Sequence, residues 1–183
     1  MKKIFLLCTV VLMTMSMMAE GHLKFKGVEI NGTQTQFIAQ LAKRGCATGT
    51  NGYGIDVIKA DFAGVNMFVH PLTTSQTKIV YAVIASTTKI DDEASFMAQY
   101  NSLKQLMTEK YGEGTSITLD DGYYANSIGY FERGEVFSPI AFTTQEGKII
   151  LYLHRDSFRA NVVVEYLDNT NDILRRKEAN DDI

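Results

Sequence analysis

Cysteine is scarce in this chain, and its scarcity limits the available chemistry. Only two of the 183 residues are cysteines, Cys8 and Cys46. Cys8 lies within an apolar run, residues 4–18, that we predict to be removed, and no small residue precedes it to allow lipid attachment. Cys46 is then left without a partner for an intrachain disulfide. We interpret it as a buried, inert thiol, while an intermolecular bond or a reactive thiol stays open.

Clustered positive charge is also lacking. Once Lys2 and Lys3 leave with the first 19 residues, 16 basic residues face 21 acidic ones, which gives a net charge of −5. The densest basic cluster, Arg175-Arg176-Lys177, is followed closely by acidic residues. Because phosphate binding requires clustered Lys and Arg, this balance argues against nucleic acid as a partner.

Motifs for metals, nucleotides and catalysis are missing as well. The three histidines, His22, His70 and His154, are scattered, whereas zinc signatures require closer ligand pairs. The acidic clusters lack EF-hand spacing. The glycine-rich residues 49–54 lack the Lys-Ser/Thr ending of a phosphate loop, so we predict a surface loop there. The sequence therefore implies no cofactor and no catalytic residue.

The N-terminal residues carry the clearest positive signal. Met1-Lys2-Lys3 is a short basic start, Ile4 to Met18 carries no charge, and Ala19 supplies a small residue before a cleavage site. This pattern is typical of a cleaved export signal, and the uncharged run is shorter than the roughly 20 residues that span a bilayer. We predict a signal peptide at residues 1–19 and one domain at residues 20–183, exported to the periplasm or cell exterior without a transmembrane anchor.

Hydrophobic periodicity predicts two main helices among many short strands. Thr33 and Gln36 form a capping box before a helix over residues 34–44. Acidic residues 91–93 precede an apolar stripe at helical spacing that ends at Gly112. The stripe consists of Phe96, Tyr100, Leu103, Met107 and Tyr111. Strands are predicted at residues 23–26, 55–62, 65–70, 78–86, 116–119, 127–132, 140–144, 148–154 and 161–167.

We therefore predict an α+β fold in which an antiparallel sheet of seven or eight strands carries two helices on one face. Residues 170–183 are predicted as a short C-terminal helix or tail. The order of elements, a helix and then strands in each half, hints at a duplication, although no residue pattern repeats.

The start of the predicted mature chain, His22-Leu23-Lys24-Phe25-Lys26-Gly27-Val28-Glu29-Ile30-Asn31-Gly32-Thr33, resembles that of small exported proteins of Bacteroidetes. The segment Asp61-Phe62-Ala63-Gly64 and the helix ending Glu109-Lys110-Tyr111-Gly112 are similar to that family too. The family has no assigned activity, so the resemblance implies a fold and a compartment but no site. In element order the chain also resembles β-lactamase-inhibitor-like modules of bacterial envelopes, which is a fold-level analogy that favours protein binding.

Two groups of residues are candidates for binding. Cleavage after Ala19 would expose Glu20, Gly21 and His22, whose amine, amides and imidazole can hold Cu(II) or Ni(II) in a square plane. An aromatic segment between turns would offer a contact surface for sugars or proteins, although tyrosines are also ordinary strand residues. Its members are Tyr123, Tyr124, Tyr130 and Phe131.

Taken together, the sequence favours an exported, non-catalytic module that binds a protein, peptide or glycan in the envelope. Two alternatives stay open. One is a hydrolase-type enzyme of unrecognised class, which would need scattered acids or a pairing of Cys46 with His70 or His154. The other is a structural subunit of an envelope assembly, joined through a sheet edge or the C-terminal tail.

Overall fold

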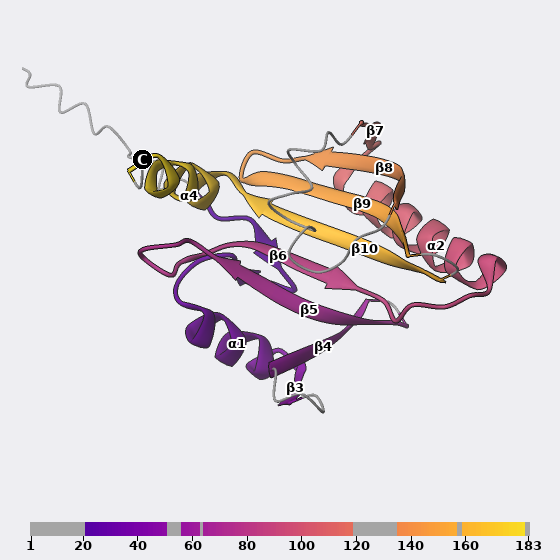
Figure 1. Ribbon diagram of the computed structural model, residues 1–183, viewed down its shortest axis with the longest axis horizontal. Helices are drawn as coiled ribbons and strands as arrows, with labels where there is room; N and C mark the ends of the chain where they lie inside the picture. Colours follow the sequence, from indigo (N-terminus) through magenta and orange to yellow (C-terminus); the bar gives the residue numbers. More distant parts are fainter. Residues whose placement is uncertain (1–20, 51–55, 63, 119–134, 157–158, 182–183) are drawn as a thin grey trace, which may run out of the picture.

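The computed structural model describes residues 21–50, 56–62, 64–118, 135–156 and 159–181. It confirms the α+β class and the large antiparallel sheet (Figure 1). The helices described are α1 (Gln34–Lys43), α2 (Glu93–Tyr111) and α4 (Asn169–Asp181). A separate hairpin consists of β1 (Lys24–Phe25) and β2 (Val28–Glu29). The sheet strands are β3 (Ala47–Thr50), β4 (Asp56–Phe62), β5 (Val65–Thr73), β6 (Val80–Ser86), β7 (Thr115–Ser116), β8 (Glu135–Thr143), β9 (Gly147–Asp156) and β10 (Arg159–Asp168).

The sheet has the same order of elements in its two halves. Its strands run β3-β4-β5-β6-β10-β9-β8-β7, and all neighbours are antiparallel. Helix α1 precedes β3–β6, and α2 precedes β7–β10. The halves meet where β6 pairs with β10, with Ser86 opposite Val163 and Ala82 opposite Leu167. Each half therefore places its last strand at the centre and its first strand at an edge, which fits the duplication that the element order suggests.

The helix ends follow the predicted chemistry. The Thr33 hydroxyl accepts a hydrogen bond from the Gln36 N–H at 3.4 Å, and the Thr33 N–H donates to Gln36 Oε1 at 2.9 Å. This confirms the capping box. Asp92 caps α2 by accepting from the Ser95 N–H at 3.1 Å, and Gly112 ends that helix with a φ of 83°.

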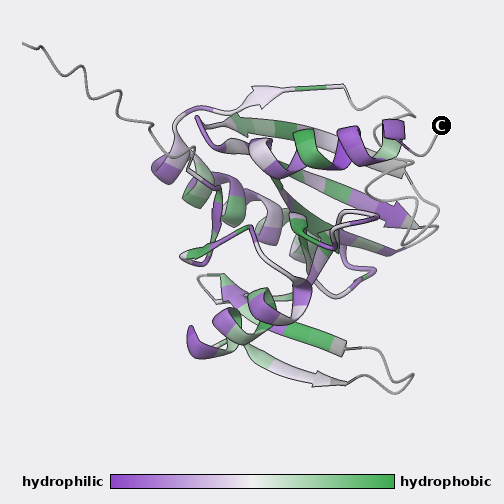
Figure 2. Cartoon of the chain, turned by 90° about the vertical axis from the view of Figure 1, so that its left-hand side faces the viewer, coloured by the Kyte–Doolittle hydropathy of each residue, from purple (hydrophilic) through white to green (hydrophobic). Residues whose placement is uncertain are grey.

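One apolar cluster joins α1 and α2 to the sheet. Phe37 and Leu41 enter it from α1, and four residues of the predicted α2 stripe enter it from the second helix. Because strand side chains alternate between faces, the cluster takes every second residue of β9 and β10. These residues are Ile149, Leu151, Leu153, Ala160, Val162, Val164 and Tyr166. A smaller cluster of Ile84, Ala141, Ile150, Tyr152 and Val163 lies on the opposite face. Figure 2 shows hydrophobic residues concentrated along the central strands.

Two sequence predictions about strand ends were wrong. Residues 49 and 50, predicted as loop, belong to β3, where Gly49 pairs with Val57. Pro71, predicted to close a strand, lies inside β5 and pairs with Val83. The pairing of β5 with β4 ends at Val69, before Pro71. The absence of an N–H on Pro71 therefore removes no hydrogen bond between β5 and β4. The strand predicted at residues 127–132 lies outside the described residues.

Candidate functional site

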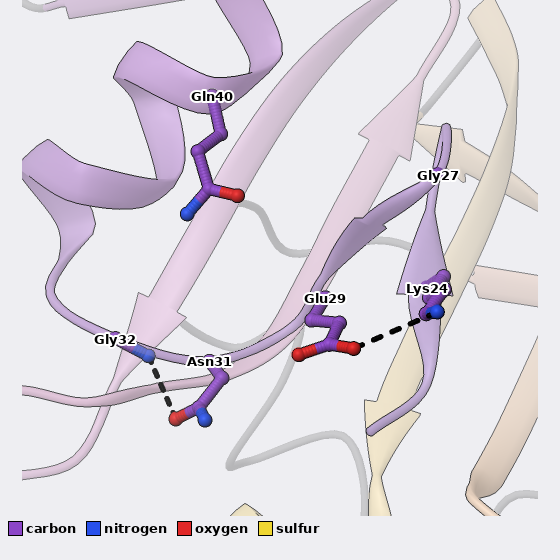
Figure 3. Close-up of a pocket in the computed structure, with 6 residues that line it drawn as sticks. All are labelled: Lys24, Gly27, Glu29, Asn31, Gly32 and Gln40. Carbon is purple, nitrogen blue, oxygen red and sulfur yellow. Dashed lines mark hydrogen bonds and ion pairs between the residues drawn. The ribbon is translucent and has the colours of Figure 1, made fainter. Parts of the chain in front are cut away.

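A polar pocket lies where the β1–β2 hairpin faces α1. Its volume is about 380 Å³, within the range of small-molecule sites. Figure 3 shows Lys24 and Glu29 on the hairpin, Asn31 and Gly32 on the chain leading to α1, and Gln40 directed from the helix toward the hairpin. The residues that line it are Lys24, Gly27, Glu29, Asn31, Gly32 and Gln40.

The hairpin is built by a two-residue turn. Lys26 and Gly27 both have positive φ values, 48° and 76°, as a type I′ turn requires. The turn sets Lys24 opposite Glu29 and Phe25 opposite Val28. Phe25 and Val28 point into the apolar cluster, so their neighbours Lys24 and Glu29 are left at the surface. Burial of the apolar pair thus fixes the position of the charged pair.

The end of the hairpin leads directly into α1. The Gly32 N–H donates to Asn31 Oδ1 at 2.7 Å, and Gly32 has a φ of 73°. A Cβ at position 32 would lie 2.9 Å from Gln36 Oε1, the atom that caps the helix. Glycine is therefore required both by the backbone conformation and by the capping box.

The pocket offers one cation, one anion and an uncommitted amide. Lys24 Nζ lies 3.5 Å from Glu29 Oε1, and both side chains are more than half exposed. The Gln40 amide has no hydrogen-bond partner among the described residues and is exposed. Exposed pairs of this kind contribute little to folding stability. These groups can instead donate to and accept from a polar ligand.

A buried polar network supports the pocket from behind. Asp168, fully buried, accepts from the Leu23 N–H at 2.8 Å and from the Asn171 N–H at 2.9 Å. His22 Nδ1 lies 3.2 Å from Asp168 Oδ1, and Asn31 Nδ2 lies 2.9 Å from His22 Nε2. Asn171 in turn donates from Nδ2 to the carbonyl oxygen of Ile30 at 2.8 Å. The network fixes Asn31, and through it the floor of the pocket.

The structure places two of the three residues of the predicted metal site, Gly21 and His22. His22 belongs to the network just described, and Gly21 precedes it near the Glu146 side chain. Binding a metal through Nδ1 would require His22 to give up Asp168. Glu20 lies outside the described residues, so the square-planar site stays a prediction. Within the described residues, no three His, Cys, Asp or Glu side chains gather as a metal site.

The predicted aromatic surface falls outside the part of the chain that the structure describes. Its members are Tyr123, Tyr124, Tyr130 and Phe131. That surface therefore stays a prediction.

Neither suggested thiol–imidazole pair gains support, and His70, which follows Val69 of the apolar cluster on β5, faces away from that cluster. Cys46 is buried and free, as interpreted from the sequence, and it belongs to the apolar cluster under the helices. Burial raises the pKa of its thiol, and nearby Lys26 offsets this only in part. His154 follows Leu153 of that cluster, so its side chain points to the other face of the sheet. Cys46 and His154 thus lie on opposite sides of the sheet.

Sequence reasoning missed a row of polar residues on that second face. Tyr152, His154, Asn161 and Glu165 are all buried. Register places Asn161 opposite His154, and Val163 separates Asn161 from Glu165 along β10. Asn161 donates to the Thr87 carbonyl at 3.4 Å, while its own Oδ1 has no partner among the described residues. Asn161 and Glu165 are four residues apart on β10 and therefore lie on the same face of the strand. The three valines between them make the segment resemble an ordinary apolar strand, so this polar pair was not recognised.

The pocket residues were also missed as a site. From the sequence, residues 23–26 are predicted as a strand and Thr33 as a helix cap, and nothing local connects them with Gln40 of α1.

Comparisons with protein families, curated proteins and solved structures found no match for this chain. Among the described helices, none combines the length and the apolar character needed to cross a membrane.

Proposed function

We propose that the chain is an exported, non-catalytic binding module. In this proposal it holds a polar group of a protein, peptide or glycan between the β1–β2 hairpin and α1. The observation that carries the proposal is the pocket itself, which presents the Lys24 ammonium, the Glu29 carboxylate and the Gln40 amide together at the surface. Matched donors and acceptors of this kind suit hydroxyl groups and peptide amides.

The surroundings of the pocket favour binding over catalysis. Lys24 and Glu29 are exposed and paired with each other, so neither occupies the desolvated environment that activates a catalytic acid or base. The network from His22 through Asp168 holds the pocket floor in one conformation. The apolar side chains of α1 and α2 enter the same cluster as Phe25 and Val28, which would leave the polar side of the hairpin free to contact a partner. A fixed surface loses little entropy on binding.

The alternative of a hydrolase-type enzyme has one specific observation behind it. The buried polar row on the second sheet face sets His154 opposite Asn161, with Tyr152 at the next position of that face on β9 and Glu165 beyond Val163 on β10. Titratable groups gathered in a buried position are a common feature of active sites. The row would then be the place where mutation abolishes turnover, while pocket variants would leave turnover intact.

The test is an NMR titration of the exported, processed protein with neutral oligosaccharides and short peptides. We expect saturable shifts at the amides of residues 24–32 and at the Gln40 side chain for one of these ligand classes. Gln40→Ala and Glu29→Gln should weaken binding about tenfold each, because each removes roughly one hydrogen bond worth 1 kcal/mol or more. Gln105→Ala is the matched control, since Gln105 is also an exposed helical glutamine but lies on α2.

Shifts that map elsewhere, or that survive in Gln40→Ala and Glu29→Gln, would overturn the proposal. Breakdown products appearing during the titration would favour the enzyme. In that case His154→Gln should stop their formation and the pocket variants should not.

A further inference from the structure

Helix α4 is attached to the fold by polar groups. Its buried residues are Asn171, Asp172 and Glu178, while Ile173 is 68% exposed. Asn171 donates to the carbonyls of Ile30 and Val80, at 2.8 and 3.0 Å. These contacts hold only the first turn of the helix. Beyond the first turn, Leu174 is half-buried, Arg175 lies over the Tyr81 ring, and Glu178 makes a further contact.

That interaction is made by the Glu178 carboxylate with the loop between β5 and β6. The N–H of Gln76 donates to Oε2 at 2.6 Å, and the N–H of Thr77 donates to Oε1 at 3.2 Å. The Thr77 hydroxyl donates to Oε1 at 2.5 Å and the Ser75 hydroxyl to Oε2 at 3.4 Å. Successive N–H groups that converge on one anion form a nest, a recurring type of anion site.

The loop is shaped by its own hydrogen bonds. The hydroxyls of Thr74 and Thr77 share a hydrogen bond of 2.8 Å, and the Ile79 N–H donates to Thr74 Oγ1 at 3.1 Å. The Thr74 N–H donates to the Ile79 carbonyl at 2.9 Å, and Thr74 is only 1% exposed. These bonds link loop residues to one another and to the start of β6. None of these bonds involves α4, so they can hold the shape of the loop when the helix is undocked.

We propose that residues 74–77 form a carboxylate-binding site, that Glu178 is its tethered resident ligand, and that the site accepts a carboxylate of an acidic peptide when α4 leaves. The tether gives Glu178 an effective concentration in the millimolar range or above, so an external carboxylate competes poorly while α4 is docked. Removal of the Glu178 charge makes the site available.

Protonation of Glu178 would weaken the docking of α4, but an external carboxylate, with an ordinary pKa of about 4, is also protonated at that pH, so acid undocks the helix without loading the site. Burial alone would raise the pKa of Glu178, but hydrogen bonds from Thr77, Gln76 and Thr74 outweigh it and lower the pKa to about 2. Because the pKa is lowered on docking, the docked Glu178 carboxylate stabilises the fold at pH values above its ordinary pKa of 4.5. This stabilisation is lost as the pH falls toward 2. The charged residues within three positions of Glu178 on α4 are Arg175, Arg176, Lys177 and Asp181, and Lys78 directly follows the loop.

The experiment follows the backbone amides of Gln76 and Thr77 by NMR in the full processed chain. In the natural sequence their proton shifts should titrate together, with a midpoint between pH 4.5 and pH 2. Glu178→Gln should abolish this titration. Asp181→Asn should leave it unchanged, because it removes the same charge from the same helix without touching the loop.

The second arm tests binding in trans with the Glu178→Ala chain. Sodium acetate, and a peptide with the sequence of residues 169–183, should each shift the Gln76 and Thr77 amides saturably. The same peptide with Gln in place of its position-178 Glu should bind at least tenfold more weakly. Equal binding of the two peptides would overturn the proposal, as would the absence of any carboxylate-dependent shift.

Discussion

Helices α2 and α4 each follow the fourth strand of one half of the sheet, yet they attach to it in opposite ways. Helix α2 buries four large side chains, Phe96, Tyr100, Leu103 and Met107. Helix α4 buries Asn171, Asp172 and Glu178. Apolar burial is non-directional and insensitive to pH, whereas polar docking depends on the charge and direction of each group. The same position in the two halves thus carries a helix with large apolar buried residues in one and a helix with polar buried residues in the other.

The largest expected effect concerns the apolar side of this comparison. Leu103→Ala removes a side chain that is 1% exposed and leaves a cavity under α2, so unfolding should become about 2–5 kcal/mol easier. Leu106→Ala makes the same change on the same helix at a residue that is 38% exposed, and should cost less than about 1 kcal/mol. Urea unfolding of both variants measures the difference. Equal losses would mean that α2 is not held by this stripe.

The next effect concerns the start of α4. Both carboxylate oxygens of Asp168 accept a backbone N–H, from Leu23 and from Asn171. An asparagine at position 168 can serve only one of them, so Asp168→Asn should cost about 1–3 kcal/mol for the buried N–H left unsatisfied. Asp61 accepts a single N–H, from Gly64, at an exposed site. Asp61→Asn should therefore change the free energy of unfolding by less than about 0.5 kcal/mol. Urea unfolding measures both variants, and equal losses of stability would refute the role given to Asp168.

Acid should weaken the attachment of α4 and leave that of α2 unchanged. As pH falls from 4.5 toward 2, Glu178 takes up its proton and the far end of α4 loses its anchor. Native-state hydrogen exchange, corrected for intrinsic rates, should show protection falling in α4 while α2 keeps its protection. In Glu178→Gln the protection of α4 should be low already at pH 7 and change less with acid. Parallel loss in both helices would point to global unfolding instead.

This contrast also explains what the sequence could predict. The α2 stripe and the Thr33 capping box are local patterns, readable from spacing alone, and both are confirmed. The contact of Glu178 with Thr77 joins residues 101 positions apart. No periodicity marks such a pair, and the polar composition of residues 170–183 suggested only a short helix or tail.

The candidate pocket was hidden for a similar reason. Lys24 and Glu29 are neighbours through the hairpin register, which alternation within one predicted strand does not reveal. Gln40 reaches the same place only because Phe37 and Leu41 turn the other face of α1 into the core. The pocket thus depends on tertiary packing, and no motif in the sequence encodes it.

The smallest expected effect tests whether Ile173 contributes to the attachment of α4. Ile173→Lys replaces the one strongly exposed large hydrophobic residue among the described residues of α4, and unfolding stability should change by less than about 0.5 kcal/mol. Urea unfolding at two protein concentrations makes the measurement decisive. A loss of about 2 kcal/mol would mean that Ile173 is covered in solution, and a loss present only at the higher concentration would assign that cover to a second copy of the chain. A small and concentration-independent change would show that Ile173 takes no part in holding α4, which leaves the hydrogen bonds of Asn171 and Glu178 and the half-buried Leu174 to hold it.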